Sequence, residues 1–254
     1  MAPAAEDLHT HLTILRDVSE SLGRMIGDPT SVFEFATREL ADIIGDACVL
    51  ALVDEEREHL VPTVFHHRDP YGEEVMRDLY LGGPVDMGRG LAGEVAATGV
   101  SVRISGIPMD QMKASVEPRY RPYVEQFDTS SVLIVPLMDS GTVIGTLGLS
   151  REAEFSELDE QLATDLATLF SLAIVRTRLE EESHRSLELL TTITNSLPAM
   201  IGYWNSDVRN EFANDAYVTY FGQSPEQMRG KHGRDLLGPA LFEQNVGYMK
   251  AALA

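Results

Sequence analysis

Few side chains in the sequence have types and spacings that would support chemistry. Cys48 is the only cysteine, which excludes an intrachain disulfide, a cysteine-rich zinc site and a two-cysteine redox cycle within one chain. Its neighbours Ala47, Val49 and Leu50 are apolar and favour a buried structural thiol. Because spacing assigns no Ser-His-Asp set and no pair of carboxylates, we expect no catalysis by this chain.

Two pairs of histidines would form a binding site only if other ligands joined them. His66 and His67 are adjacent, so in a strand they point to opposite faces and one of them could enter a pocket. Because no Cys, Asp or Glu is spaced to complete a metal site with them, we favour surface or loop-capping roles. His9 and His11 fall on an expected helix, and we predict that both are solvated.

The glycines Gly88, Gly90 and Gly93 form the G-x-G-x-x-G pattern of dinucleotide-binding loops. Such a loop follows a buried strand and opens a helix that crosses to a parallel strand, whereas residues 82–87 (GGPVDM) make a poor strand. Glu94 would also stand where a phosphate approaches. We expect instead that the first two glycines permit a tight turn and that the third permits close packing.

Composition and charge limit the classes of protein to which the chain can belong. Its 254 residues are 44% hydrophobic, which is enough for one large or two ordinary domains. The net charge of −20 repels nucleic-acid phosphates and anionic membranes, so we expect neither as a partner. The longest apolar run, 132–138, is too short to span a bilayer, and residues 1–7 lack the features of a signal peptide. We therefore expect a cytoplasmic location without membrane insertion.

One long helix organises the expected elements. Ser156 can cap its first turn and no Gly or Pro interrupts the chain before Pro198, so we predict a continuous helix over 156–196. At 1.5 Å per residue it would be about 60 Å long, which exceeds what one domain's core needs. We predict that its start belongs to one globular domain and that its far end leads into a second. The alternative is an ordinary terminal helix followed by a disordered tail.

Two helical segments carry apolar residues at alternating steps of three and four, which is the spacing of a coiled-coil seam. The seam residues are Leu8, Leu12, Leu15, Ser19, Leu22 and Ile26 in a first helix over about 7–26, and Leu172, Val175, Leu179, Glu182, Ser186, Leu189 and Ile193 in the long helix. We expect a homodimer through these helices, in parallel or antiparallel orientation. The first helix can pair with the long helix, with its own copy, or with both.

Between the two helices, the pattern predicts an α+β domain with one antiparallel sheet and flanking helices. The expected elements are helices at 30–43, 70–80 and 91–98, and strands at 48–53, 59–66, 100–104, 132–137 and 142–149. Residues 105–129 contain Pro108, Pro118 and Pro122 and are the least regular part. Long excursions of this kind are often lids or binding walls.

A pocket beside this irregular segment is the strongest candidate for a ligand site. Aromatic and methionine side chains can form an adaptable apolar wall, and an arginine on the preceding strand could hold an anionic group. The candidate ligand-binding residues are Arg103, Met109, Met112, Tyr120, Tyr123 and Phe127. The alternative is that these side chains simply fill the core between the segment and the sheet.

After Pro198 the pattern resets and predicts a second, smaller segment. Its expected elements are strands at 200–205 and 208–212, a helix capped by Asn214, a helical turn starting at Pro225, and a final helix over 239–253. The predicted division of the chain is an N-terminal helix (1–28), a globular domain (29–176), the long helix that completes and extends it (156–196), and the second segment (197–254).

Three stretches, taken together, resemble the GAF domain family. They are residues 88–99 (GRGLAGEVAATG), 131–137 (SVLIVPL) and 143–149 (VIGTLGL), followed by Phe155 and the long helix. The resemblance covers roughly residues 10–180, and the element order of the family agrees with the order predicted above. GAF domains are typically sensors of small molecules or chromophores, so the resemblance implies a sensory role.

A second resemblance is to the first half of a PAS domain. It is carried by residues 197–204 (LPAMIGYW), 212–217 (FANDAY), 221–222 (FG) and 230–232 (GKH). A PAS domain has three more antiparallel strands after this part, so we expect an exposed second core that is loose or pairs intermolecularly. A GAF domain followed by a PAS domain implies the N-terminal sensory region of a bacterial signalling protein.

The resemblance also indicates which cofactors to test. The Asn-Lys, Phe and Asp-Glu signature of cyclic-nucleotide-binding GAF domains is missing, and Cys48 lies on the first strand, where a covalent bilin is not attached. Residues 119–124 offer no axial His for haem, and methionine-sulfoxide-reducing members need several cysteines. We therefore predict neither haem nor covalent bilin, and leave the ligand unidentified.

These observations predict a non-catalytic sensory and regulatory region. A small ligand or a partner would alter the packing of the first domain, and the change would bias the pairing of the long helix. The family resemblance implies an output such as a diguanylate cyclase or a histidine kinase beyond residue 254. The alternative is a ligand-free dimerisation scaffold whose pocket is filled by its own side chains.

Overall fold

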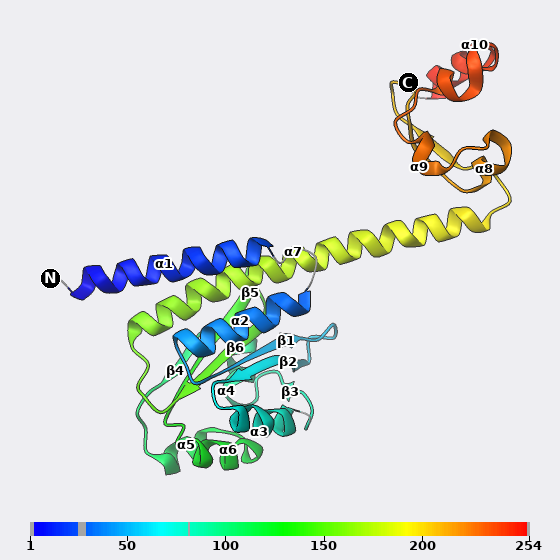
Figure 1. The fold of residues 1–254 in the computed structure, drawn as a ribbon. Helices are drawn as coiled ribbons and strands as arrows, with labels where there is room; N and C mark the ends of the chain where they lie inside the picture. Colours follow the sequence, from blue (N-terminus) through cyan, green and yellow to red (C-terminus); the bar gives the residue numbers. More distant parts are fainter. Residues whose placement is uncertain (1–2, 25–28, 81, 253–254) are drawn as a thin grey trace. The chain divides into compact units, whose positions relative to one another are not determined.

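A computed structural model of the chain describes residues 3–24, 29–80 and 82–252. The chain divides into two compact units, Met1–Glu180 and Glu181–Ala254. The first unit contains a six-stranded sheet and the second contains a two-stranded sheet (Figure 1). Among the described helices, none is both long enough and apolar enough to span a membrane.

The first unit and the helix that leaves it contain the predicted elements in the predicted order. The elements are α1 (Pro3–Arg24), α2 (Pro29–Ile43), β1 (Ala47–Val53), β2 (His59–His67), α3 (Pro70–Tyr80), β3 (Val85–Asp86), α4 (Gly90–Thr98), β4 (Val102–Ile104), α5 (Met109–Ser115), the 3-10 helix η1 (Pro118–Tyr120), α6 (Arg121–Gln126), β5 (Ser131–Asp139), β6 (Thr142–Arg151) and α7 (Glu157–Ser196). The α+β prediction, with one antiparallel sheet and flanking helices, is confirmed.

Two local predictions were wrong. The segment at 105–129, expected to be irregular, contains α5, η1 and α6. Its prolines precede these helices or occupy their first positions, where a missing N–H costs nothing, so they start helices rather than prevent them. The poor strand at 82–87 does supply a two-residue edge strand, β3, which pairs with His59 and Leu60 of β2.

The sheet has the strand order β3-β2-β1-β6-β5-β4, and all neighbouring strands are antiparallel. Side chains alternate between its two faces because the side-chain period of a strand is two. On β1, Cys48 and Leu50 point to one face, whereas Ala47, Val49 and Ala51 point to the other. We call these the inner and the outer face. Helices α2 and α7 cover the inner face, and α3, α5 and α6 lie on the other side (Figure 1).

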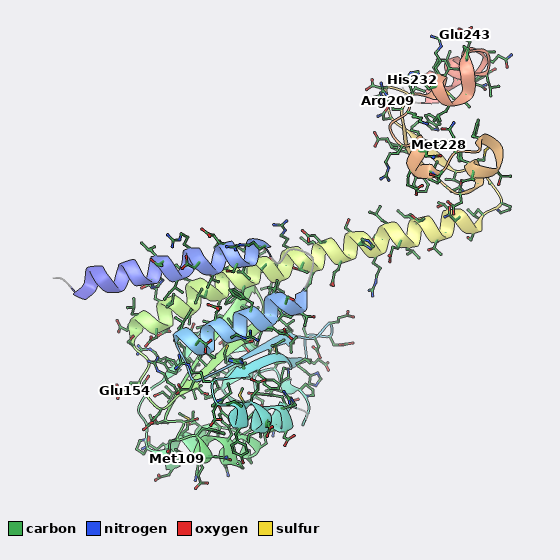
Figure 2. All side chains as sticks on the ribbon, viewed as in Figure 1. Met109, Glu154, Arg209, Met228, His232 and Glu243 are labelled. Atoms are coloured by element: carbon green, nitrogen blue, oxygen red, sulfur yellow. The ribbon has the colours of Figure 1, made fainter. Side chains whose placement is uncertain are left out.

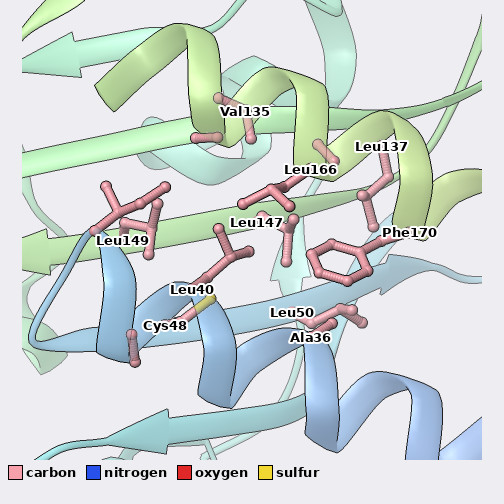
Figure 3. Packing of buried hydrophobic residues seen from close by; sticks show 14 of the residues in the cluster. Ala36, Leu40, Cys48, Leu50, Val135, Leu137, Leu147, Leu149, Leu166 and Phe170 are labelled. Carbon is pink, nitrogen blue, oxygen red and sulfur yellow. The ribbon is translucent and has the colours of Figure 1, made fainter. Parts of the chain in front are cut away.

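The inner face forms the main core of the first unit. Figure 3 shows leucines from β1, β5 and β6 meeting Leu40 of α2 and both Leu166 and Phe170 of α7. The fully buried members include Leu40, Leu50, Leu133, Leu137, Leu147, Leu166 and Phe170. Large apolar side chains from both layers therefore fill this interface, as close packing of a protein interior requires.

Helix α1 packs against this core with one face. Val18 is buried, and Ile14, Leu15 and Leu22 contact the inner-face cluster. Of the predicted seam, Leu15 and Leu22 therefore pack within the chain, whereas Leu12 and Ser19 are exposed. The side chain of Leu8 and the whole of Ile26 lie outside the described residues.

The prediction of a solvated His11 was wrong. His11 is only 6% exposed, and its Nε2 lies 2.9 Å from Asp165 Oδ2 of α7. The side chain lies on the same face of α1 as Val18, so it is carried into the contact with α7. A polar contact therefore joins the first helix to the long helix within one chain.

Helix α7 is continuous from Glu157 to Ser196, as predicted. Its start is a reciprocal cap, in which Ser156 Oγ accepts from Asp159 N at 3.1 Å and Asp159 Oδ2 accepts from Ser156 N at 2.8 Å. Up to Thr177 the helix has a buried face, and from residue 178 to 193 every side chain is exposed within the chain. The two halves of one helix thus differ in environment.

The second unit has a small core. Its elements, besides the end of α7, are β7 (Gly202–Trp204), β8 (Asn210–Ala213), α8 (Ala216–Phe221), α9 (Pro225–Met228) and α10 (Gly233–Ala252). Ala213, Leu236 and Met228, which Figure 2 labels, form the buried cluster, with Trp204 and Tyr217 partly buried against it. Large apolar side chains such as Met200, Tyr203 and Leu241 are exposed.

Three details of this unit differ from the prediction. Val208 has a left-handed backbone (φ 57°) and belongs to the turn before β8 rather than to the strand. Asn214 does not cap α8 but holds the chain before it, donating to Thr194 O and Ala199 O and accepting from Ile201 N. The predicted final helix is the second part of α10, which has a non-helical residue at Gly238.

Candidate functional site

The outer face of the sheet encloses a cavity of about 160 Å³. Strands β1, β2, β5 and β6 form its floor, and residues of α3, α4, η1 and α6 form its walls. We call it the outer-face cavity. It lies wholly within the first unit, on the side of the sheet opposite the packed core.

Small side chains at the middle of the sheet create the space. Ala47 and Ala51 of β1 and Thr146, Gly148 and Ser150 of β6 alternate with the large residues that point to the core. A Cβ added to Gly148 would meet only Ile134 Cγ1, at 3.9 Å. A glycine inside a strand weakens it and often marks a bulge, a bend or the close approach of a ligand or another backbone.

Aromatic side chains make one wall of the cavity. Tyr80 of α3, Tyr120 of η1 and Tyr123 of α6 all line it, and the rings of Tyr80 and Tyr120 are 6.1 Å apart. Burial raises the pKa of all three phenols, that of Tyr123 to about 12. The three side chains are therefore neutral near pH 7. The Tyr123 hydroxyl lies 3.4 Å from Ser150 Oγ on the floor.

Charged side chains stand where η1 meets the start of α4. Arg89 and Glu117 line the cavity, and Gly90 lies beside Glu117. Arg89 pairs with Asp86 at 3.3 Å, and Glu117 lies 3.5 Å from Arg119 Nε. Arg119 Nη1 also donates to Gly83 O. Each charge at this position therefore already has a partner of opposite sign.

Of the candidate ligand residues predicted from the sequence, two line the cavity, three lie in the cluster beside it, and Arg103 lies elsewhere. Tyr120 and Tyr123 line the cavity. Met112 is buried in the adjoining cluster, where Met109 (Figure 2) and Phe127 are partly buried. The Phe127 ring packs 4.9 Å from that of Tyr123, so it supports the wall from behind.

Arg103 lies away from the described lining of the cavity. Its Nε donates to Glu160 Oε2 at 2.8 Å and its Nη1 donates to Phe155 O at 3.0 Å. It therefore ties β4 to the start of α7. Spacing along the chain put Arg103 near the irregular segment, but the strand directs its side chain toward α7.

His67 has a structural position next to this wall. Its ring is buried, lies 4.8 Å from Phe127, and accepts a hydrogen bond at Nδ1 from Asp69 N at 2.9 Å. Burial lowers its pKa, so it is neutral near pH 7. The loop-capping role predicted from the sequence fits this bond, whereas His66 is half-buried beside Glu73 at 3.2 Å.

Several lining residues were not identified from the sequence, among them Gly148, Ser150, Arg89 and Glu117. A signal for the floor was present in β6, where Thr146, Gly148 and Ser150 alternate with leucines. Small residues at every second position of a central strand indicate space on one face. No such pattern in the sequence predicts that Glu117 lines the cavity, because its position depends on how η1 packs.

The strand that forms the floor is also bonded to the start of α7. Arg151, which follows Ser150 on β6, donates to Asp159 Oδ2 at 2.7 Å and to the carbonyl oxygens of Ile44 and Glu154. Its guanidinium lies 4.1 Å from the centre of the Phe155 ring. The side chain that holds the first turn of α7 therefore belongs to the residue next to Ser150 of the cavity floor.

A metal site would need a cluster of ligating side chains, and thiol chemistry would need a reactive cysteine. In the described part of the chain, no group of three or more His, Cys, Asp or Glu could hold a metal. The thiol of Cys48 is buried in the inner-face core, and burial raises its pKa, which disfavours a reactive thiolate. The chemistry that this arrangement supports is binding of a small molecule.

Comparison with known protein families gives a match for each of the two parts of the chain. Residues 27–175 match the family model described as GAF domain, and residues 194–254 match the model described as PAS fold. A search of curated protein sequences found no match.

Similar solved structures share the fold of the first unit. They include the GAF domain of a phosphoenolpyruvate-protein phosphotransferase from Coxiella burnetii (18% identity, TM-score 0.56, 68% of this chain and 96% of that chain). The free methionine-R-sulfoxide reductase from Neisseria meningitidis, solved with its substrate, is also similar (18% identity, TM-score 0.53, 67% of this chain and 91% of that chain). At this level of identity the similarity establishes the fold but not a shared activity. The chain belongs to the GAF domain family, and a partial PAS fold follows its GAF domain.

Proposed function

We propose that this chain is the sensory region of a bacterial signalling protein, in which a ligand in the outer-face cavity changes the pairing of α7 between two copies of the chain. GAF and PAS domains are sensory and regulatory domains of signalling proteins. In this proposal the region has no catalytic activity, acts in the cytoplasm, and controls an output of the diguanylate cyclase or histidine kinase type.

The observation that carries the proposal is the bond between β6, whose residues form part of the cavity floor, and α7. A ligand that displaces Ser150 also displaces Arg151, because the two residues are consecutive on β6. Arg151 holds Asp159, and Asp159 caps the first turn of α7 together with Ser156. A small shift of β6 therefore changes the contacts that fix the start of the helix.

The exposed seam residues of α7 offer a surface for a second copy of the chain. Leu172, Leu179 and Ile193 are exposed within the chain and are separated by multiples of seven residues. Leu189 falls on the same seam and is exposed, whereas Val175 is partly buried against the inner-face core of its own chain. Glu182 and Ser186 interrupt the apolar residues of the seam. A seven-residue apolar repeat suits a two-stranded coiled coil, and its polar interruptions weaken it so that two arrangements can lie close in free energy.

Solution mass tests this dimer with a matched pair of variants. Leu179 and Leu187 lie on the same helix and are 61% and 62% exposed, but only Leu179 is on the seam. We expect the parent chain and Leu187→Asp to be dimers by light scattering, and Leu179→Asp to dissociate at least tenfold more readily. A parent chain that is monomeric at high concentration, or equal dissociation of both variants, contradicts the proposal.

A ligand-free dimerisation scaffold is the second candidate function. It is favoured by the buried side chains that already pack on the outer side of the sheet, including Met112 and Val124. The two candidates differ in one outcome: a scaffold dimerises through α7 but binds no small molecule in the cavity.

A further inference from the structure

The outer-face cavity has the size of a single ring. Its volume is about 160 Å³, and an engineered protein cavity of about 150 Å³ lined by aliphatic side chains holds one benzene molecule. A nucleotide or a tetrapyrrole is several times larger than this space. The inference that follows rests on the proposed sensory function of the same cavity and names the class of its ligand.

The lining favours an apolar ligand. Most of the lining side chains are apolar, such as Val49, Leu60, Met76, Val85 and Ile134. Transfer of a charged group from water to such surroundings is unfavourable unless the site pairs the charge. The three tyrosine rings of the wall offer edges and faces to an aromatic ring, which prefers tilted contacts of this kind.

The charged residues of the lining do not supply a partner for a charged ligand. Among the described lining residues, the charged ones are Arg89 and Glu117, so their charges cancel. Asp86 already pairs with the exposed Arg89, and Arg119 already lies beside Glu117. A carboxylate in the cavity would therefore lie near Glu117 without an unpaired cation to offset it.

The pair formed by Tyr123 and Ser150 can satisfy a polar substituent of a ligand. The Tyr123 hydroxyl and Ser150 Oγ lie 3.4 Å apart, and each hydroxyl can donate once and accept twice. Their mutual contact uses only part of this capacity. The pair can therefore exchange one hydrogen bond with a hydroxyl on a ligand ring.

We propose that the outer-face cavity binds an uncharged, single-ring aromatic molecule, with room for one hydroxyl group at Tyr123 and Ser150. Gly148 is the floor of this site, because any side chain at that position would occupy the space of the ring. A glycine in a central strand lowers stability, and access for a ligand explains why Gly148 stands at this position.

Fluorine NMR of the full chain tests the proposal with three compounds of similar size. We expect fluorobenzene and 4-fluorophenol to show saturable line broadening that unlabelled toluene reverses. We expect 4-fluorobenzoate, which carries a negative charge at pH 7, to bind at least tenfold more weakly. If 4-fluorobenzoate binds as well as fluorobenzene, or if no neutral ring binds, the proposal is overturned.

Two variants locate the binding in this cavity. Gly148→Leu fills the floor and is expected to reduce fluorobenzene binding at least tenfold, whereas the control Gly23→Leu, on the exposed side of α1, leaves it unchanged. Ser150→Ala is expected to weaken 4-fluorophenol about fivefold, the equivalent of one hydrogen bond, without changing fluorobenzene. Because Ser150→Ala removes a single surface atom of the cavity, this test holds even if Gly148→Leu does not fold. Binding that neither variant changes would overturn the assignment to this cavity.

A separate readout distinguishes this inference from the proposed function. Saturating toluene is expected to change amide hydrogen exchange in the first turns of α7, and Arg151→Met is expected to remove that change without removing toluene binding. Binding of toluene without any change in α7 would support the ligand class and overturn the sensory mechanism. Loss of toluene binding in Arg151→Met would contradict the assigned place of Arg151 outside the site.

Discussion

The two faces of the six-stranded sheet use the same strands for different purposes. On the inner face, leucines of β1, β5 and β6 interlock with α2 and α7 and leave these side chains fully buried. On the outer face, the same strands present Ala47, Ala51 and Gly148, and a cavity lies above them. The difference shows how a single strand can hold a domain together with one set of side chains and make room for a ligand with the other.

The difference between the two faces also bears on the position of Arg151, which bonds the end of β6 to α7. Residues 147 and 149 are locked into the core, so the inner face cannot move without loss of packing. Ser150 and Arg151 follow this locked part, and their partners are polar. Hydrogen bonds and ion pairs can change partners more readily than a packed core can be rearranged. The end of β6 is therefore the part of the strand best able to respond.

The largest expected effect comes from adjacent residues of β1 that point to opposite faces. Leu50→Ala on the inner face should lower the free energy of unfolding by about 2–5 kcal/mol, because it leaves a void in a packed core. Val49→Ala on the outer face should cost only about 1 kcal/mol, because it enlarges an existing cavity. Urea denaturation of both variants measures the difference. Equal losses would show that the outer face is packed as tightly as the inner face.

Two glycines on the outer side provide a smaller contrast. A Cβ at Gly72 would overlap the ring of His67, so Gly72→Ala should destabilise by about 1–3 kcal/mol. A Cβ at Gly148 would have its nearest neighbour at 3.9 Å, so Gly148→Ala should be neutral or stabilise by about 0.4–1 kcal/mol. The midpoints of urea unfolding of the two variants and the parent chain measure these changes in stability. A loss of stability in Gly148→Ala would contradict open space above Gly148.

The smallest effect is a dependence on pH from the buried His67. Burial lowers its pKa in the folded state, so the unfolded state binds more protons below its ordinary value of about 6.5. Stability should therefore fall as the pH drops through this value toward the lowered pKa. Asp69, Asp46 and His66 are the other titrating groups that influence it.

The change in melting temperature between pH 7.5 and 5.5 tests this, and His67→Gln should show a smaller loss than the parent. His59 is the matched control, because Asp54 raises its pKa and His59→Gln should shift the pH dependence in the opposite direction. If both variants shift it in the same direction, the pH dependence does not report the burial of His67.

Much of the fold could be predicted because its signals are local. The apolar runs of β1 and β6 and the cap at Ser156 each specify an element from its own residues. Residues 105–129 were harder, because prolines that start helices look the same in sequence as prolines that prevent them. The aromatic wall was found in part, since Tyr120 and Tyr123 line the cavity, but Arg103 points to α7.

By itself the sequence determined the α+β class, the continuous helix over 157–196 and the order of a GAF segment followed by a PAS segment. Periodicity, caps and family motifs are properties of neighbouring residues, so they can be recognised without the tertiary structure. Only the tertiary structure decided that His11 is buried against Asp165 and that Arg151 joins β6 to α7. It also decided that small residues on two strands enclose one cavity. These features depend on which residues from distant parts of the chain meet across the sheet, and spacing along the chain does not contain that information.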